Sequence, residues 1–284
     1  MARQQIVLVT GCSTGIGRAA AIEASERGHR VFATARDRAD LAGLEGRTGL
    51  RTLALDVADS ASISEAVATT LAEAGRIDAL VNNAGYGQYG AVEDVRVEDW
   101  RAQFEVNVFG AIAMIQAVLP SMRAAGSGTI VNVSSVVGKI AIPFAAPYCA
   151  SKHALEAISD ALRVEVAGFN VRVVLVEPGP IATKFGDRAR AGVAKLLGRP
   201  GPYAHLYGNA ERAMDTEFRA GQLPPESVAR VIVDAIESPN PKTRYPVGRM
   251  ARVLIPLRRL LTDRAIDRRM RKTLGVPGPG EGRR

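Results

Sequence analysis

Cysteine, histidine and aromatic residues are scarce in this chain of 284 residues. It has 2 Cys, 3 His and 1 Trp, and aromatic residues make up 5% of it. Cys12 and Cys149 are too few for a disulfide scaffold and stand in no metal-ligand pattern, so we expect a reduced, cytoplasmic setting and no metal site.

Long apolar runs are also missing. Stretches such as Ile6 to Val9 have the length of strands, and the N-terminus lacks the layout of a signal peptide, so no membrane-spanning segment is expected.

Acidic residues are scarce only near the C-terminus. Residues 242 to 284 contain 13 Lys or Arg and 3 acidic residues, whereas the first 241 residues contain 24 and 26. The net charge of +8 therefore combines +10 in this last segment with −2 in the body of the chain. A nearly neutral body argues against binding to nucleic acid.

Strand and helix patterns alternate through most of the chain. Near-continuous apolar strands separated by helices are typical of a parallel sheet that is covered on both faces. We therefore expect an α/β fold: a doubly wound, Rossmann-like parallel sheet with helices on both faces and a C-terminal helical flap. The predicted strands are Ile6–Thr10, Arg30–Ala35, Thr52–Asp56, Ala79–Asn82, Thr129–Ser134 and Val171–Glu177, and the predicted helices are Arg18–Arg27, Ser62–Ala74, Val97–Ala124 and Pro147–Ala167.

This alternation ends after Pro178. Residues 184–225, rich in Gly, Pro and Arg, are predicted to form an irregular substrate flap with short helices within one catalytic domain, residues 1–248. A helix over Pro225–Ile236 and a strand over Arg244–Val247 are expected to complete that domain. Residues 249–274 read as a basic amphipathic extension, and the Gly- and Pro-rich residues 275–284 as a disordered tail.

A glycine-rich loop, Thr-Gly-Cys-Ser-Thr-Gly-Ile-Gly, follows the first predicted strand. Gly11 permits a tight turn, Gly15 allows a ligand to approach the backbone, and Gly17 lets the following helix pack against the sheet. The N–H groups and dipole of that helix favour a pyrophosphate. The predicted nucleotide cradle comprises Gly11, Ser13, Thr14, Gly15, Ile16 and Gly17.

The end of the second strand indicates which cofactor is used. An acid there suits the ribose hydroxyl of NAD, whereas an Arg suits the 2′-phosphate of NADP. The chain reads Thr34-Ala35-Arg36-Asp37, so Ala35 takes the place of the acid and Arg36 follows it. Arg36 therefore favours NADP(H), although Asp37 could neutralise Arg36 or tolerate NAD.

Tyr148 and Lys152 are four residues apart in Tyr-Cys-Ala-Ser-Lys, so on a helix they share one face. A phenol has an ordinary pKa of roughly 10, and a neighbouring ammonium favours the phenolate. We therefore expect Lys152 to lower the pKa of Tyr148 and make it a general acid or base beside a bound cofactor.

Six motifs occur in order: the glycine loop, Asp56, Asn82-Asn83-Ala84-Gly85, Asn107, Ser135 with Tyr148-x-x-x-Lys152, and Pro178-Gly179. Over residues 5 to about 250 the chain resembles the short-chain dehydrogenase/reductase family, in its compact branch with TGxxxGIG and YxxxK motifs. Within it, the chain is similar to the 17β-hydroxysteroid dehydrogenase type 1 and retinol dehydrogenase group. The resemblance implies cofactor contacts from Asp56, Val57, Asn83, Ala84, Gly85, Pro178, Gly179, Ile181 and Thr183, as well as from Tyr148 and Lys152.

The same resemblance implies a role for each catalytic residue. Tyr148 would exchange a proton with the reacting oxygen, and Lys152 would also bind the nicotinamide ribose. Ser135 would bind the reacting oxygen; Ser134 competes for this role, but strand alternation points the two serines to opposite sides. Asn107 would bend its helix and hold a water that relays protons to Lys152.

The implied activity is an NADP(H)-dependent interconversion of an alcohol and its ketone or aldehyde, on a hydrophobic steroid-, retinoid- or lipid-like substrate. Alternatives are reduction of a quinone-like or acyl-chain carbonyl, or a regulator that senses NADP(H) without turnover; such regulators typically lack the Tyr/Lys pair. Residues expected near the substrate are Ser135, Tyr86, Gln88, Tyr89, Phe144 and Phe185.

The segment Arg249–Leu274 combines an apolar stripe, interrupted by Pro256, with a ring of Arg. It could contact an anionic membrane surface peripherally, cap the substrate pocket or pack on a neighbouring subunit. Packing with a solvated Arg face is the simpler interpretation. The long helices around Asn107 and Tyr148 resemble those that form subunit interfaces in the family, which predicts a homodimer or homotetramer.

Overall fold

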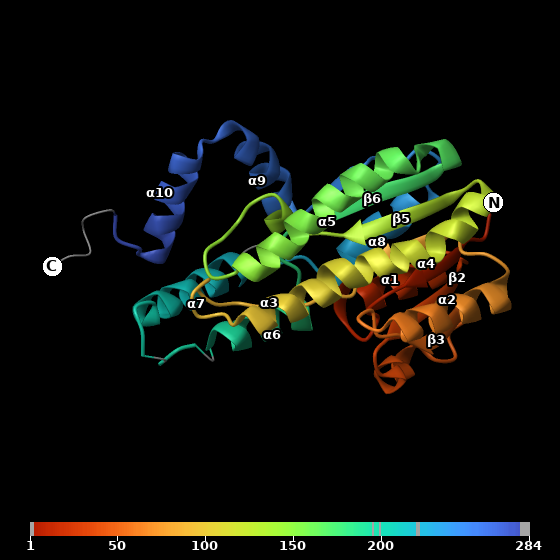
Figure 1. Ribbon diagram of the computed structural model, residues 1–284, viewed down its shortest axis with the longest axis horizontal. Coiled ribbons are helices and arrows are strands. Elements are labelled where there is room, and N and C mark those ends of the chain that lie inside the picture. Colours follow the sequence, from red (N-terminus) through yellow and green to blue (C-terminus); the bar gives the residue numbers. More distant parts are fainter. Residues whose placement is uncertain (1–2, 195, 199, 220–221, 279–284) are drawn as a thin grey trace.

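Seven parallel strands form the centre of the protein in the computed structural model, which describes residues 3–194, 196–198, 200–219 and 222–278 (Figure 1). Their order in the sheet is β3-β2-β1-β4-β5-β6-β7. The chain thus winds outward from β1 in both directions, which confirms the predicted doubly wound α/β fold. The strands are β1 (Ile6–Val9), β2 (Arg30–Ala35), β3 (Leu50–Ala54), β4 (Ala79–Asn82), β5 (Gly128–Val133), β6 (Val171–Pro178) and β7 (Arg244–Val247).

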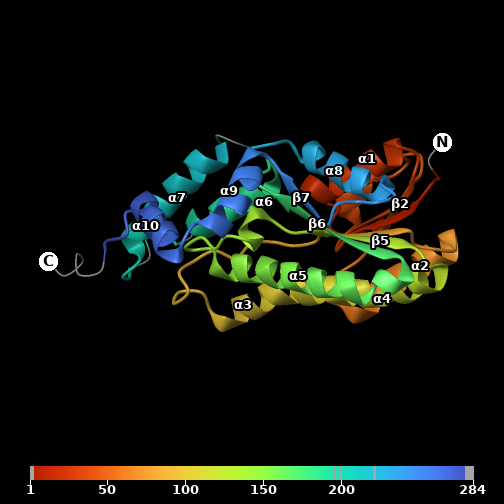
Figure 2. The same ribbon diagram turned by 90° about the horizontal axis from the view of Figure 1, so that it is seen from above.

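Helices cover both faces of the sheet (Figure 2). One face is covered by α1 (Gly15–Glu26) and α8 (Pro225–Glu237), and the other by α2 (Ser60–Ala74), α4 (Gly110–Ala125) and α5 (Ala146–Glu165). Because side chains alternate along a strand, β1 sends Val7 and Val9 to the first face and Ile6 and Leu8 to the second. Each face therefore has its own hydrophobic core.

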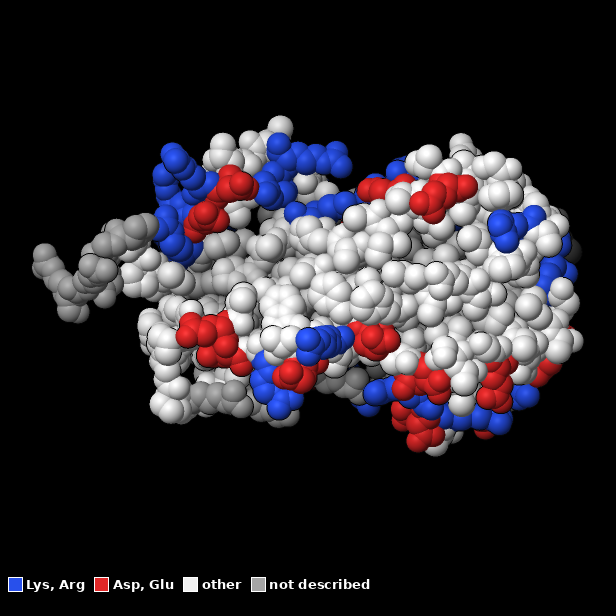
Figure 3. Space-filling view, in the orientation of Figure 1, with Lys and Arg blue, Asp and Glu red and all other residues white. Residues whose placement is uncertain are grey.

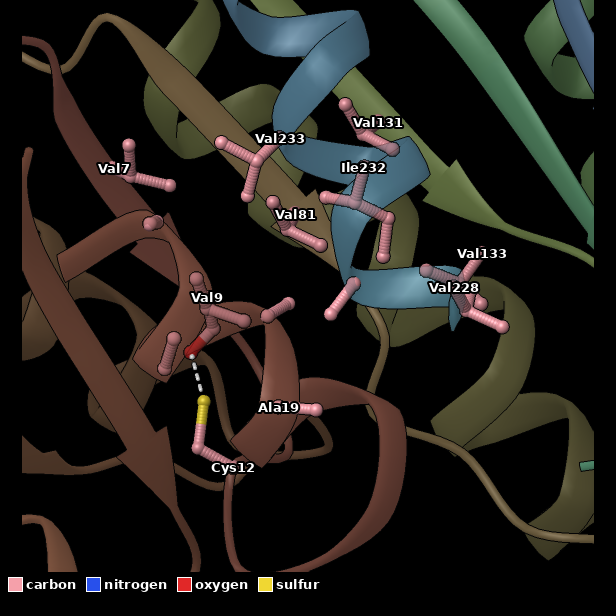
Figure 4. Close-up of a cluster of buried hydrophobic side chains, with 14 of the residues drawn as sticks. Val7, Val9, Cys12, Ala19, Val81, Val131, Val133, Val228, Ile232 and Val233 are labelled. Carbon is pink, nitrogen blue, oxygen red and sulfur yellow. Dashed lines mark hydrogen bonds between the residues drawn. The ribbon is translucent and has the colours of Figure 1, made fainter. Parts of the chain in front are cut away.

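The core under α1 and α8 includes Cys12, which lies in the glycine loop (Figure 4). Its thiol donates a hydrogen bond of 3.3 Å to the Val9 carbonyl, and burial raises its pKa to about 12. The thiolate, which is the reactive form, is therefore absent at neutral pH. Cys12 acts as a small packing group of the core.

The long helix expected over Val97–Ala124 is not one α-helix. It consists of α3 (Val97–Phe104), a π-helical turn η2 (Glu105–Phe109) and α4, and the turn contains Asn107. By length and composition, the stretch Val97–Ala125 could cross a membrane, because it contains an 18-residue window with a mean hydropathy of 1.4. In this fold Met114, Val118 and Met122 of α4 are instead fully buried against the sheet.

The segment predicted as an irregular flap is largely helical, in α6 (Lys184–Ala194) and α7 (Ala204–Arg219). The basic extension forms α9 (Arg249–Leu260) and α10 (Asp263–Leu274), and Pro256 lies inside α9 without ending it. These four helices gather beyond the carboxyl ends of the strands (Figures 1 and 2). Of the tail predicted to be disordered, residues 279–284 lie outside the described residues. Short 3₁₀ helices complete the structure: η1 (Arg38–Leu44), η3 (Val136–Gly138) and η4 (Ala167–Phe169).

Candidate active site

The glycine loop turns sharply between β1 and α1. Gly11 and Gly15 have φ angles of 73° and 61°, in the left-handed region that favours glycine. A Cβ on Gly17 would lie 2.4 Å from the Gly11 carbonyl oxygen and 2.3 Å from the Asn83 amide nitrogen. Only glycine allows α1 to begin this close to the turn.

The N-terminus of α1 fits a phosphate group. Within the described residues, the Thr14 side chain at the N-cap makes no capping hydrogen bond. The first N–H groups of a helix have no intrahelical acceptor and carry its positive dipole end. Together with the close-packed glycines, these free donors match the pyrophosphate cradle predicted from the sequence.

Asn83 and Thr10 fasten the loop after β4 to the glycine loop. The Asn83 amide donates to the carbonyls of Thr10 and Gly11 at 2.9 and 3.1 Å. In return the Thr10 hydroxyl accepts from the N–H groups of Asn83 and Ala84, both at 3.0 Å. The Asn83 side chain is therefore engaged by the protein, and it positions the cradle.

Arg36 and Asp37 follow β2 at the same edge of the sheet, and both are exposed. The Asp37 carboxylate accepts a 2.8 Å hydrogen bond from the Ala39 N–H and caps η1. Among the described residues no ion pair involves Arg36. Asp37 therefore does not neutralise Arg36, whose guanidinium remains available to an anion. Asp56 follows β3 and caps its own turn through a 3.0 Å bond from Ala58 N–H.

The segment Pro178–Thr183 is held by two distant parts of the chain. Gly179 N–H donates to the Val247 carbonyl of β7 at 2.9 Å, and Ala182 N–H donates to the Leu223 carbonyl at 2.9 Å. Thr183 lies over the glycine loop, because a Cβ on Gly15 would be 3.1 Å from its methyl group. The two predicted cofactor-binding segments therefore meet.

The π-turn directs Asn107 toward the site. Its amide donates to the Tyr86 carbonyl at 2.9 Å and to the Ser151 hydroxyl at 3.1 Å, and its oxygen accepts from Tyr86 N–H at 3.1 Å. π-turns are rare and frequent at functional sites. A small cavity of about the size of a water molecule is lined by both Asn107 and Lys152, so there is room for the bridging water expected from the sequence.

Gln103 was not singled out in the sequence, yet it holds the substrate-side loop. It is fully buried, donates to the Tyr86 carbonyl and accepts from Gln88 N–H, both at 2.6 Å. Gln103 and Asn107 are four residues apart in a helical pattern, and that shared face was the available signal. Gln103 therefore holds the backbone of Gln88 and, together with Asn107, that of Tyr86.

Tyr148 and Lys152 lie one turn apart on α5, and Ser135 precedes η3 after β5. The Ser135 hydroxyl hydrogen-bonds the Tyr148 phenol, whereas the Ser134 hydroxyl is buried and makes no hydrogen bond to the described residues. Lys152 is 6% exposed, and its Nζ donates to the Val133 carbonyl at 2.7 Å. The structure therefore brings Ser135, Tyr148 and Lys152 together.

The prediction that Lys152 lowers the pKa of Tyr148 is wrong, because the surroundings of Tyr148 in the protein raise this pKa. Burial raises the pKa of Tyr148 well above its ordinary value, and the Ser135 hydrogen bond opposes this only in part. Lys152 does not reverse it, because its Nζ is engaged by the Val133 carbonyl and lies 6.0 Å from the centre of the phenol ring. Tyr148 is therefore a neutral phenol at neutral pH.

Burial also lowers the pKa of Lys152, to about 8, and the carboxylate of Glu156 counteracts this. An ammonium removed from water loses its hydration, which disfavours the charged form. Glu156 lies one turn further along α5 and is itself buried. The charge on Lys152 near neutral pH is therefore sensitive to Glu156.

Aromatic rings surround Tyr148 on the flap side. The ring centre of Phe185 in α6 lies 5.2 Å from that of Tyr148, and Tyr89 lies at 6.4 Å. Phe144 lies elsewhere: its ring packs against Tyr207 at 5.3 Å, in a separate cluster under α7. Of the aromatic residues expected near the substrate, Phe185 and Tyr89 adjoin the phenol, whereas Phe144 packs away from it. The backbone of Phe144 is in the left-handed region, with a φ angle of 64°.

The model of the protein family "short chain dehydrogenase" matches residues 5–194. The chain belongs to the short-chain dehydrogenase family. The resemblance predicted from its motifs is thereby confirmed. Within this family, the chain is 36% identical to the human 17-beta-hydroxysteroid dehydrogenase type 1 over 256 residues, which cover 84% of this chain and 76% of that protein.

Two bacterial members of the short-chain dehydrogenase family are similar over most of their length. The 3-ketodihydrosphingosine reductase of Bacteroides thetaiotaomicron is 38% identical over 88% of this chain and 90% of its own. The NADPH-dependent 3-dehydrocapnine reductase of Ornithobacterium rhinotracheale is 34% identical over 94% and 96%. A short-chain dehydrogenase from Streptomyces avermitilis shares the fold with a TM-score of 0.79 and 32% identity, over 98% of this chain and 100% of that one.

Proposed function

We propose that this short-chain dehydrogenase reduces the ketone of a hydrophobic substrate with NADPH. The observation that carries this proposal is the meeting of Ser135, Tyr148 and Lys152 at the edge of the sheet where the glycine loop and Thr183 also meet. Ligands of doubly wound sheets bind at this edge.

The protonation state of Tyr148 supports reduction as the favoured direction. A neutral phenol can donate its proton to a carbonyl oxygen, and burial keeps Tyr148 in this form. Ser135 donates a hydrogen bond to the same oxygen and stabilises the negative charge that develops there. The ammonium of Lys152, when charged, lowers the free energy of the phenolate that the proton transfer leaves behind.

NADP(H) would be held by the α1 N-terminus at its pyrophosphate and by Arg36 at its 2′-phosphate. The exposed guanidinium at the end of β2, without an acid in the preceding position, fits this phosphate. When bound, the cofactor supplies the hydride that the protein itself cannot provide.

A long-chain lipid ketone is the substrate class that the surroundings of Tyr148 favour. Phe185 and Tyr89 flank the phenol with apolar surface, which suits a lipid better than a charged metabolite. Two relatives are named as reductases of 3-ketodihydrosphingosine and 3-dehydrocapnine, and a third as a hydroxysteroid dehydrogenase.

Oxidation of NADPH measured against a panel of carbonyl compounds tests this proposal. We expect the fastest turnover with long-chain 3-ketones, slower turnover with steroid ketones, and the slowest with quinones and acyl-chain carbonyls. The kcat/KM for NADPH should exceed that for NADH about tenfold or more. Tight NADPH binding without turnover of any carbonyl would instead favour the cofactor-sensing regulator.

We propose a homo-oligomer formed through the outer face of α4 and α5. Figure 3 shows an almost uncharged surface over these helices. Only 39% of the apolar window in Val97–Ala125 is buried within the chain, and Phe109 and Val164 are 53% and 74% exposed. A second copy would cover this surface. A monomeric mass by light scattering would contradict the proposal.

We also propose that α9 contacts an anionic membrane. Ala251 and Ile255 bury one side of the helix against η3, next to Ser135, which leaves Val253 and Leu260 52% and 82% exposed on the other side. Exposed arginines flank this apolar strip, and Figure 3 shows Lys and Arg gathered over α9 and α10. Apolar side chains between cations match the interface of an acidic bilayer, which would place the site close to a lipid substrate.

Vesicle flotation tests this contact. We expect the protein to float with phosphatidylcholine vesicles that contain phosphatidylglycerol, and much less with pure phosphatidylcholine. Arg252→Glu with Arg259→Glu should weaken binding at least tenfold, because each cation contributes about 1 kcal/mol at an acidic surface. Val92→Ser, at an exposed apolar residue of another surface, serves as control. Equal flotation of all variants would refute the contact.

A further inference from the structure

Five charged residues form a cluster where α5, β6, β7 and the end of η3 meet. Glu156 of α5 and Glu177 of β6 are 3% and 1% exposed, and charged residues are almost never this buried unless they are paired. We call this group the carboxylate cluster. Its members are Lys139, Glu156, Asp160, Glu177 and Arg244.

Arg244 is the centre of the cluster. Its guanidinium lies 3.1 Å from Glu156, 2.7 Å from Asp160 and 3.3 Å from Glu177. Lys139 lies 2.8 Å from Glu156, and Arg163 bonds to the outer side of Asp160 at 2.6 Å. Within the cluster, three carboxyl groups therefore face two cations.

Arg244 donates a 3.1 Å hydrogen bond to Glu156 Oε2, but among the described residues one oxygen of each buried carboxyl group has no hydrogen-bond donor. Glu156 and Glu177 lie within hydrogen-bond reach of each other, but ionised carboxylates can only accept. In the part of the chain that the structure describes, the Oε1 atoms of both residues accept no hydrogen bond, although Arg244 Nε lies 3.3 Å from Glu177 Oε1 as an ion-pair neighbour. One proton between the two groups would supply a donor and balance two negative charges against two positive ones.

The cluster joins the elements that carry the catalytic residues. Glu156 lies one turn after Lys152, Lys139 follows η3 and thus the Ser135 loop, and Glu177 precedes Pro178. Gly138 fits between these parts, because a Cβ there would lie 3.1 Å from the Glu156 side chain and 3.3 Å from the Lys152 carbonyl. A change of charge in the cluster therefore reaches all three elements.

We propose that Glu156 and Glu177 share one proton, and that this carboxyl pair positions the Ser135 loop against α5 and sets the charge of Lys152. Burial and the neighbouring Glu156 raise the pKa of Glu177 to about 7, while Arg244 and Lys139 oppose this. Loss of the shared proton adds a negative charge one helical turn from Lys152. The Lys152 ammonium is then favoured at the pH at which it would otherwise lose its charge.

The shared proton should also change how the stability of the fold depends on pH, which can be measured without turnover. A carboxyl group whose pKa rises on folding stabilises the fold fully below its unfolded value of 4.5, and this contribution is lost as the pH rises through about 7. Thermal melts between pH 5 and 8 should therefore show a wild-type decline in Tm that is flatter in Glu177→Gln. Asp160→Asn removes an outer carboxylate of the same cluster. It should keep the wild-type slope of Tm against pH, because the lowered pKa of Asp160 means that this group stays ionised between pH 5 and 8.

The role of the pair toward Lys152 rests on the proposed function and needs a pH profile. Glu156→Gln should move the basic limb of kcat/KM to lower pH, because Lys152 loses the carboxylate that keeps it charged, and should reduce kcat more than it changes KM. If Glu156→Gln does not fold, an infrared titration of the wild type replaces it, with a protonated carboxyl band present at pH 6 and absent above pH 8. Equal melting slopes, an unmoved profile or a missing band would each overturn the proposal, whereas absence of turnover would affect only the proposed function.

Discussion

Tyr148→Phe is expected to reduce turnover about 10²- to 10⁴-fold, the usual contribution of a positioned general acid. The substitution removes only the hydroxyl that hydrogen-bonds Ser135 and leaves the ring among Phe185 and Tyr89. Because the glycine loop and Arg36 are unaffected, the Kd for NADPH should change little. Single-turnover kinetics and NADPH fluorescence titration measure the two quantities.

The matched control for this variant is Tyr245→Phe. Tyr245 lies on β7, and its hydroxyl accepts a 2.9 Å hydrogen bond from Lys242 N–H, away from the catalytic residues. It should retain the wild-type rate. If Tyr148→Phe were as active as this control, proton donation by Tyr148 would be ruled out.

Arg36→Asp is expected to reverse the cofactor preference. A charge-assisted hydrogen bond contributes about 1.5–3 kcal/mol, so losing it should raise KM for NADPH by about 10- to 100-fold, and the new carboxylate should repel the 2′-phosphate further. The same carboxylate can accept from the ribose hydroxyls of NADH, whose KM should fall or stay constant.

The comparison requires both cofactors in the same preparations. Arg47→Asp makes the same change of charge at a surface arginine that lies 3.5 Å from Glu26, and it should leave the NADPH/NADH ratio unchanged. An equal rise of KM for NADPH and NADH in Arg36→Asp would refute the assignment of Arg36 to the 2′-phosphate.

The architecture was predictable because it depends on local patterns. Alternating apolar runs and helical segments are enough to predict a parallel sheet, and the seventh strand, Arg244–Val247, has the predicted bounds. The third strand ends at Ala54, two residues before its predicted end, because Asp56 caps a turn there. The flap was predicted as irregular from its Gly and Pro content, but only three of these ten residues lie inside α6 and α7, and the other seven lie between the two helices or after α7.

The site was predictable where spacing alone decides it. The interval from Tyr148 to Lys152 sets a shared helix face, and the glycine loop sets a turn. Contacts between distant elements were not predictable: an apolar helical run does not show that Asn107 lies in a π-turn. The pKa of Tyr148 depends on burial and on the Val133 carbonyl that engages Lys152, and a sequence motif contains neither.

The hydrogen bond from Gly179 to Val247 has a consequence for synthesis of the chain. The glycine loop is made first, but its counterpart beyond β6 is anchored by one of the last strands to leave the ribosome. A nascent polypeptide that stops before residue 244 lacks the Val247 carbonyl that holds Gly179. We therefore expect the Pro178–Thr183 segment to take its final position only after the C-terminal region has been made.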